Sequence, residues 1–439
     1  MTCGALVIKD MATRLVAATS GSMSFLKCPA RVFVVSLSMA VAAPALAQTP
    51  LQQAVLIASE RDPGITALRH EIARRSVDIQ AVNDQKYPQL SLSADTATTS
   101  SDGPGVTLTV SQVLYDWGRV RSMVASASQD RVVAVADLKM GIEELTLDVS
   151  NYYIDVDVLD QKIARTQGYL EFARRIADHA EARLAAGRGD NGEVARARLE
   201  VGRTEQRMDQ LSSDRMLALA QLEFLMGRNP GTLSRPADLD FVGRYRKPDA
   251  VTSAIRLSPT YISANARLGR AESEIGLARA SRLPTIRLQA QVRADLDRGR
   301  TRSSVGLSTG VDIGAGAITG RQIESARLQA EAARSNLDAV GRNLGNGVRS
   351  ALERIRVLRA SEISQRNQLS QAQQVLDNYE QQFVGGQREL IDLLTTGRDL
   401  YDAQVDQIDT YDERKRTEYS AAFDLGVLGT LILASSNQG

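Results

Sequence analysis

The chain of 439 residues is internally duplicated, with an offset of about 196 to 199 residues between the two copies. Pro63 precedes Pro88 by the same interval that separates Pro259 from Pro284. Near the end of each copy the match returns: Leu184, Gly187, Glu193, Phe224 and Gly227 correspond to Phe383, Gly386, Asp392, Phe423 and Gly426. Duplication on this scale is typical of a ring, a tube or a transporter, whereas an enzyme active site is usually asymmetric.

The first 47 residues have the features of a removable export signal. Lys27 and Arg31 precede an apolar run over 32–41, and residues 45–47 (Ala-Leu-Ala) form a small-residue cleavage site. A run of about 10 residues is too short to span a bilayer as a helix. Translation starts at Met1 or at Met23. The second start is an alternative because residues 1–22 add nothing that a signal needs.

Both cysteines, Cys3 and Cys28, lie in this removable segment. Cys28 precedes the apolar run, so it is not the acylated first residue of a lipoprotein, and we expect no disulfide in the mature chain. The whole chain has a formal net charge of +1 and the removed segment one of about +3, which leaves about −2. This balance gives no indication of nucleic-acid binding.

Each copy begins with a predicted helix of about 25 residues, over 63–87 and 259–283, because proline suits a first helical turn and the next proline ends the helix. The sequence then alternates apolar and polar residues with a period of two, which predicts strands. The clearest apolar set is Ile286, Leu288, Ala290, Val292, Ala294 and Leu296. Partner strands follow after glycine-rich turns, so each copy supplies one hairpin and the chain four strands.

A strand of about 10 residues has the length that a tilted membrane β-strand needs. Four strands cannot close a barrel, and an open sheet edge cannot sit in lipid. If the strands lie in a membrane, several chains must therefore share one barrel. The alternative is a small soluble sandwich, although no further strands are visible to form its second sheet.

The longest predicted elements are helices over 119–186 and 321–385, in which apolar residues recur every three or four positions for the whole length. A sustained seven-residue repeat indicates helices that supercoil against neighbours. A helix of about 65 residues reaches roughly 100 Å. Return helices over 192–226 and 390–425 are shorter, so we expect each opening helix and return helix to stack end to end beside the long helix.

Between the copies, residues 228–257 are rich in Pro, Gly and Asp. We interpret this stretch, the belt segment, as a band around the middle of the helical part; a disordered linker is the alternative. The expected organisation is a signal over 1–47, a first repeat over 48–227, the belt segment over 228–257, a second repeat over 258–427 and a tail over 428–439.

Two motifs carry a resemblance to a known family. Residues 113–119 (Val-Leu-Tyr-Asp-Trp-Gly-Arg) resemble the strand-to-helix junction of the TolC family of outer-membrane export channels, and residues 383–394 resemble its second periplasmic tip. The resemblance covers essentially the whole mature chain. It implies an α+β membrane protein: a homotrimer with a 12-stranded β-barrel in outer-membrane lipid, continued by a 12-helix tunnel through the periplasm.

The same resemblance implies a passive exit duct in a Gram-negative outer membrane, working with a periplasmic adaptor protein and an inner-membrane transporter, either an ABC or a proton-driven one. The form of the second tip and the absence of a lipoprotein cysteine favour type I protein secretion. Efflux of drugs or other small molecules is the alternative. A more remote hypothesis is a periplasmic coiled-coil adaptor or structural protein without a pore.

The gate is expected near the second tip. Asp392 matches the first aspartate of the family's constricting ring, in which three carboxylates around one axis bind cations and raise one another's pKa. Thr395 stands where the best-known members have a second aspartate, and Arg388 where the family has an arginine that links neighbouring helices. The alternative for Asp392 is a solvated carboxylate on a helix face, and that for Arg388 is an ordinary surface arginine. We expect gate opening to occur by movement of the second copy, whereas the first copy serves mainly as channel wall.

The tips, residues 183–187 and 383–386, are predicted to contact the adaptor. The residues concerned are Arg183, Leu184, Gly187, Phe383 and Gly386. Because glycine allows the chain to reverse with positive φ, the alternative is that these residues are helix caps.

Within the barrel, the predicted pore-lining residues are Arg287, Arg293, Asp295 and Asp297. Tyr115 and Trp117 are expected at the inner lipid boundary, where aromatic residues concentrate. The second strand-to-helix junction differs, because extra residues follow Asp312-Ile313-Gly314 before Arg321. No His or Cys cluster and no glycine-rich phosphate loop occur in the sequence, so we expect no metal, no other cofactor and no enzymatic activity.

Overall fold

The computed structural model describes residues 49–96, 103–297, 299–310 and 320–435. The chain divides into Met1–Leu46 and Ala47–Gly439, and everything below concerns the second unit. The predicted signal and both candidate start codons lie outside the described residues. Most of the second strand-to-helix junction, residues 311–319, also lies outside them.

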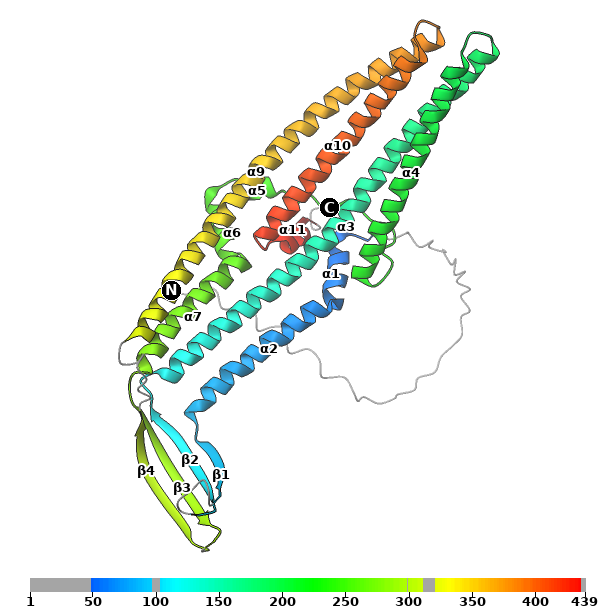
Figure 1. Ribbon diagram of the computed structural model, residues 1–439. Helices are drawn as coiled ribbons and strands as arrows, with labels where there is room; N and C mark the ends of the chain where they lie inside the picture. The colour runs from blue at the N-terminus through cyan, green and yellow to red at the C-terminus, as the bar shows by residue number, and fades with distance from the viewer. Residues whose placement is uncertain (1–48, 97–102, 298, 311–319, 436–439) are drawn as a thin grey trace, which may run out of the picture. The chain divides into compact units, whose positions relative to one another are not determined.

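The two copies share one series of main elements: two helices, a β-hairpin, a long helix and a return helix (Figure 1). The first copy contains α1 (Leu51–Arg61), α2 (Pro63–Asn83), the 3-10 turn η1 (Asp84–Lys86), β1 (Gln89–Asp95), β2 (Gly105–Tyr115), α3 (Arg119–Ala185) and α4 (Asn191–Met226). The remainder contains α5 (Phe241–Arg244), α6 (Pro248–Leu257), α7 (Pro259–Ala280), β3 (Thr285–Asp295), β4 (Thr301–Gly310), α9 (Arg321–Val384), α10 (Leu390–Asp424) and α11 (Leu428–Ser435).

Local chemistry explains where the helices begin. Asp62 accepts a hydrogen bond from the backbone N–H of Ile65 at 2.8 Å, just before Pro63 opens α2. At the start of α3 the Asp116 carboxylate accepts from the N–H groups of Gly118 (3.0 Å) and Val120 (2.7 Å). The motif at residues 113–119 therefore contains the cap that turns a strand into a helix.

The four strands form one antiparallel sheet in the order β1-β2-β3-β4, so the hairpins of the two copies meet at the β2–β3 pair. The register places apolar residues of all four strands on one face, for example Leu92, Leu108 and Val292. The opposite face carries Ser, Thr, Gln and Arg side chains. The predicted alternation is thus a property of the whole sheet.

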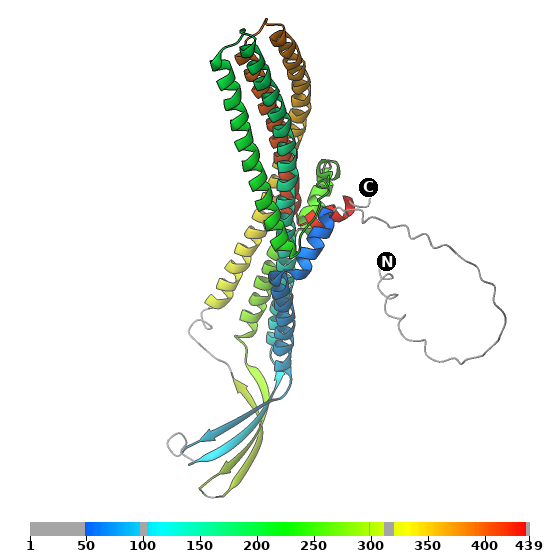
Figure 2. The same ribbon diagram turned by 90° about the vertical axis from the view of Figure 1, so that its right-hand side faces the viewer.

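Each long helix has an opening helix and a return helix packed beside it, as the predicted helix lengths indicate. Both α2 and α4 pack against α3, and both α7 and α10 pack against α9. The copies are joined because α7 and α10 also pack against α3. Figure 2 shows α3, α4, α9 and α10 running together toward the two tips, on the far side of the helices from the sheet. None of the helices in the described part of the chain is long and apolar enough to cross a membrane.

Apolar side chains gather in two clusters. The larger joins α1, α11 and the belt segment to the middle of α3 and α9 and to the C-terminal half of α10, and the smaller lies near the tips. Tyr153 and Ile154 are fully buried in the larger cluster, whereas the neighbouring Tyr152 is only partly buried. Helices pack against α3 on several sides, so its burial is not confined to one seven-residue seam.

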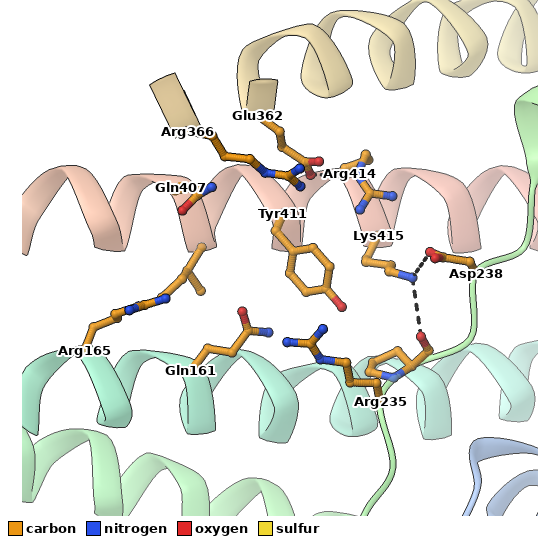
Figure 3. Close-up of a pocket in the computed structure, with 12 residues that line it drawn as sticks. Gln161, Arg165, Arg235, Asp238, Glu362, Arg366, Gln407, Tyr411, Arg414 and Lys415 are labelled. Atoms are coloured by element: carbon orange, nitrogen blue, oxygen red, sulfur yellow. Dashed lines mark hydrogen bonds and ion pairs between the residues drawn. The ribbon is translucent and has the colours of Figure 1, made fainter. Parts of the chain in front are cut away.

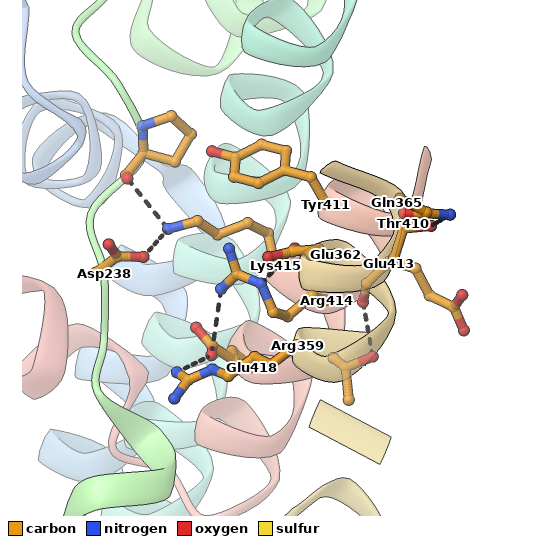
Figure 4. Close-up of polar contacts among 12 residues, drawn as sticks. Asp238, Arg359, Glu362, Gln365, Thr410, Tyr411, Glu413, Arg414, Lys415 and Glu418 are labelled. Carbon is orange, nitrogen blue, oxygen red and sulfur yellow. Dashed lines mark hydrogen bonds and ion pairs between the residues drawn. The ribbon is translucent and has the colours of Figure 1, made fainter. Parts of the chain in front are cut away.

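The belt segment is hydrogen-bonded to α10. Lys415 is only 2% exposed and donates to the carbonyl oxygen of Ala237 at 3.1 Å. It also forms an ion pair with Asp238, as Figure 4 shows. The Tyr419 hydroxyl donates to the same carbonyl at 2.9 Å. Nearby, the buried Glu418 accepts from Arg359 at 2.8 Å. A buried ammonium is tolerated only with such partners, so Lys415 fixes where the segment crosses α10.

Candidate functional site

At the second tip, Arg388 links the beginning of α10 to the end of α9. Its Nη1 lies 3.3 Å from Oδ2 of Asp392, and its Nε donates to Oε1 of Gln382 at 3.1 Å. The guanidinium carbon also lies 3.9 Å from the centroid of the Tyr379 ring. Arg388 thus has three partners in one chain, and one of them is the predicted gate carboxylate.

Asp392 begins a row of polar side chains along α10. Thr395 donates its hydroxyl proton to the carbonyl of Ile391 at 2.8 Å and is exposed. Asp399, Asp402 and Asp406 follow at spacings of three and four, which places them on one side of the helix. We name these three residues the acidic stripe.

None of the three carboxylates of the acidic stripe has an ion pair within the described ranges. Burial raises the pKa of Asp402, and the carboxylates of Asp406 and Asp399 contribute in the same direction against the opposing charge of Arg398. The acidic stripe was not identified in our sequence analysis, although its spacing is visible in the sequence. Its unpaired negative charges would attract cations.

The two tips close with the same backbone pattern. The N–H of Arg188 donates to the carbonyl of Arg183 at 2.9 Å, and that of Gln387 donates to the carbonyl of Gln382 at 2.8 Å. Gly187 and Gly386 have φ angles of 70° and 74°. Both glycines therefore end helices, whatever else the tips contact.

The tips also contact each other. The Arg183 guanidinium carbon lies 4.8 Å from the centroid of the Phe383 ring, which is 1% exposed. Leu184 packs at the margin of the same apolar cluster. In this structure Phe383 is therefore a core residue that supports the tip, and its neighbour Val384 is the exposed one.

Farther from the tips, small and aromatic residues join α10 to α3. Gly397 faces the Phe172 ring so closely that a Cβ atom would overlap it. Thr166 and Tyr401 share a hydrogen bond at 2.9 Å, and the rings of Tyr169 and Tyr401 stack with centroids 4.9 Å apart. The second return helix thus fits closely against the first copy.

A salt bridge extends this junction to α4. The Tyr169 hydroxyl donates to Glu200 at 2.8 Å, and Arg398 of α10 forms an ion pair with the same carboxylate. Movement of α10 away from the other copy would have to break this set of contacts.

On the sheet, the structure brings together two of the four predicted pore-lining residues. Arg293 lies 3.1 Å from the buried Asp295 and 2.9 Å from Asp95. Arg287 and Asp297 are exposed. The mixed charges expected from the alternation are therefore partly neutralised next to the turns of the sheet.

The predicted boundary aromatics lie together at the first strand-to-helix junction. The rings of Tyr115 and Trp117 meet edge to face with centroids 4.8 Å apart, and both are about half exposed. Trp117 has a φ of 55°, unusual for a residue with a side chain, and its indole N–H donates to the carbonyl of Pro284 at 2.9 Å. This bond links the junction to the start of β3.

Within the part of the chain that the structure describes, no group of three or more His, Cys, Asp or Glu residues could hold a metal ion. Our sequence analysis also missed Tyr379, Gln382 and the contact of Phe172 with Gly397. The first two lie within a few residues of the recognised motif. The last pair joins different copies and leaves no local signal.

A family model supports the resemblance. The model described as "Outer membrane efflux protein" matches residues 55–228 and 251–421. Among curated proteins, the outer membrane efflux protein BepC of Brucella suis biovar 1 is 25% identical over 318 residues, which are 71% of this chain and 68% of BepC. The cobalt-zinc-cadmium resistance protein CzcC of Cupriavidus metallidurans is 22% identical, over 66% of this chain and 69% of CzcC. The outer membrane protein TolC of Salmonella enteritidis is 21% identical, over 77% and 74%.

Solved structures show the same fold at low sequence identity. CusC superposes with a TM-score of 0.74 at 16% identity, over 87% of this chain and 92% of CusC. The outer membrane protein VceC of Vibrio cholerae gives 0.72 at 17% identity, over 86% and 96%. The open state of the MtrE channel of Neisseria gonorrhoeae gives 0.70 at 18% identity, over 86% and 88%.

Proposed function

The chain belongs to the outer membrane efflux protein family and has its TolC-like fold, and we propose on that basis that it is the exit duct of a tripartite export system. It lies in the outer membrane of a Gram-negative bacterium and extends into the periplasm. The family and the fold are those of channels rather than enzymes. The proposed duct is passive, and a transporter in the inner membrane supplies the energy.

The observation that carries this proposal is the two-faced sheet with two open edges. β1 and β4 each pair on one side only, and their outward apolar residues include Leu92 and Leu307, both about 70% exposed. In lipid the unpaired backbone groups of an open edge are costly. Three copies that join edge to edge would form a closed barrel of 12 strands.

The helical part supports the same arrangement. α4 packs mainly against α3, and α9 packs against α10 and α7; both α4 and α9 present large apolar side chains to solvent. Phe224 of α4 is 77% exposed, and Ile363 of α9 is 61% exposed. Contacts between α4 of one copy and α9 of the next would cover these residues and close the tunnel.

We assign the gate to the second tip. Asp392, paired with Arg388, begins the polar row that continues through Thr395 to the acidic stripe. In a threefold assembly this row would appear three times around the axis. The adaptor would contact the exposed parts of the tips, near Arg183, Leu184, Gly187 and Gly386, with Phe383 as their buried support.

For cargo, the form of the second tip favours type I protein secretion. A second candidate is the efflux of small molecules or ions. Relatives named for resistance to cobalt, zinc and cadmium, for resistance to fusaric acid and for pyoverdine export support it. The unpaired acidic stripe adds to this support, since it favours small cations over anions.

Purified protein in a planar bilayer tests the duct. We expect a detergent-resistant trimer and ion conductance; a monomer without conductance would refute the proposal. For cargo, a deletion strain is compared with the same strain carrying the intact gene. Loss of one secreted protein supports type I secretion, whereas sensitivity to toxic ions or drugs with an unchanged set of secreted proteins supports efflux.

A further inference from the structure

A cavity of about 400 Å³ lies where α3, α9 and α10 meet the belt segment (Figure 3). Its lining contains five cationic side chains and two anionic ones, an excess of three positive charges. These side chains are Arg165, Arg235, Arg366, Arg414 and Lys415, with Asp238 and Glu362. A volume of this size is within the range of small-molecule sites.

Both anionic side chains of the lining already have partners. Asp238 forms an ion pair with Lys415, and Glu362 accepts from Arg414 at 2.7 Å. A further carboxylate nearby, Asp157, accepts from the Tyr411 hydroxyl at 3.1 Å. The carboxylates around the cavity are therefore engaged by other groups.

Three arginines remain. Within the described residues, Arg165 of α3, Arg235 of the belt segment and Arg366 of α9 have neither a hydrogen bond nor an ion pair. In Figure 3 the Arg235 side chain points toward Gln161 and Tyr411, beneath the helix that carries Tyr411. Like charges that face one cavity repel one another, so an anion placed among them lowers the electrostatic energy.

The geometry points to a binding site for a small polyvalent oxyanion, phosphate or a short dicarboxylate, in this cavity. The guanidinium groups of Arg165, Arg235 and Arg366 bind its oxygens, because their paired N–H groups match carboxylate and phosphate geometry. The amide of Gln407, also in the lining, supplies a neutral donor, whereas that of Gln161 already donates to Asp157 at 2.9 Å. The three arginines belong to the first copy, the belt segment and the second copy, so the anion links all three parts.

Thermal unfolding of the purified mature protein in detergent tests the site, with sodium phosphate, sodium succinate and sodium chloride compared at equal ionic strength. A ligand that binds only the folded protein raises the unfolding midpoint as its concentration rises. We expect phosphate or succinate, but not chloride, to raise the midpoint in a saturable manner. The tighter of the two identifies the class of anion.

The triple variant Arg165→Gln, Arg235→Gln, Arg366→Gln is expected to weaken this binding at least tenfold. Its matched control replaces three exposed arginines of α3, α4 and α9 that lie outside the cavity, Arg131→Gln, Arg196→Gln and Arg349→Gln, and is expected to bind like the wild type. Equal weakening in both triple variants, or no response of the wild type beyond that to chloride, would overturn the proposal.

A second variant covers the case in which the triple variant does not fold. Arg366→Glu supplies a carboxylate to the two remaining arginines from within the chain. We expect it to fold and to lose the response to phosphate and succinate. A wild-type response in this variant would contradict the site. Channel conductance is expected to persist in these variants, so failure of the anion site is distinguishable from failure of the proposed duct.

Discussion

The guanidinium of Arg183 covers the buried ring of Phe383, so the tip of the first copy rests on the tip of the second. Nη1 of Arg183 is buried without a hydrogen-bond partner in the part of the chain that is described, which leaves the ring face as its main contact. Opening of the second tip must therefore disturb the first, although only the second contains the predicted gate residues.

Phe383→Ala is expected to destabilise the tips and to raise the resting conductance. Truncation of a buried phenylalanine costs about 3–5 kcal/mol, and loss of the cation–π contact contributes roughly 0.5–2 kcal/mol of it. Single-channel recording and thermal unfolding are the measurements. Val384→Ala, at an exposed neighbour, is the control and should resemble the wild type. If both variants behave alike, the contact between the tips does not contribute to closure.

Asp392→Ala is expected to raise conductance and to weaken block by a trivalent cation, because each chain of the trimer loses one carboxylate near the axis. Thr395→Asp should have the opposite effect on block, by about tenfold, which corresponds to roughly 1.4 kcal/mol. Dose–response curves of block in planar bilayers measure both. Asp377→Ala removes an exposed carboxylate of α9 that is bonded to Gln373 and serves as the control. Block that is unchanged in all three variants would refute the gate assignment.

Gly397→Ala tests the close fit of α10 against α3. The added methyl group overlaps the Phe172 ring, and overpacking of this kind costs about 1–3 kcal/mol. Gly202→Ala of α4 is the matched control, because nothing lies near its added methyl group and alanine favours a helix by up to about 1 kcal/mol. We expect the unfolding midpoint to fall in the first variant and to stay or rise in the second. A stable, unaltered Gly397→Ala channel would show that the two helices separate easily.

Glu143→Gln is expected to stabilise the protein at pH 7 but not at pH 4. Burial raises the pKa of the Glu143 carboxyl above its ordinary value of 4.5, although the N–H of Gly429 donates to it at 3.1 Å. The folded state thus binds this proton more tightly than the unfolded state, so the contribution to stability is present below the unfolded pKa and is lost as pH rises through the folded pKa.

The amide introduced by Glu143→Gln keeps an acceptor for the N–H of Gly429 and removes the titration, so a gain in stability at pH 7 is expected. Unfolding midpoints between pH 4 and pH 8 measure it. Glu144→Gln, at the exposed neighbour, is the matched control. A constant difference between wild type and Glu143→Gln across this range would contradict the assignment.

The main features of the fold were predictable because they follow from local patterns. Prolines mark the starts of α2 and α7, and alternation marks β3, each within a few residues of the observed bounds. The short helices α1 and α11 were not predicted. Each is stabilised mainly by burial against α3 and neighbouring helices, a tertiary contribution that an 8 to 11 residue stretch does not reveal.

The site was predictable only where its residues are close in sequence. Arg388 and Asp392 are one helical turn apart, and the structure pairs them. The contacts of Arg183 with Phe383 and of Phe172 with Gly397 join residues from different copies. No periodicity specifies which face of one copy meets the other, so these contacts needed the structure.

The pairing of Gly105 with Asp295 has a consequence for the order of folding. Between these two partners in the chain lie α3, α4, α7 and the belt segment. The first hairpin therefore remains unpaired with β3 until these segments have crossed the inner membrane. An isolated two-stranded hairpin is marginal in water, and closing so long a loop is slow. We expect the helices of the first copy to form early and the sheet last. The apolar face of the sheet, which binds lipid, would then form only when the chain is ready to trimerise. A chain truncated before Thr285 should therefore remain in the periplasm, as fractionation of cells would show.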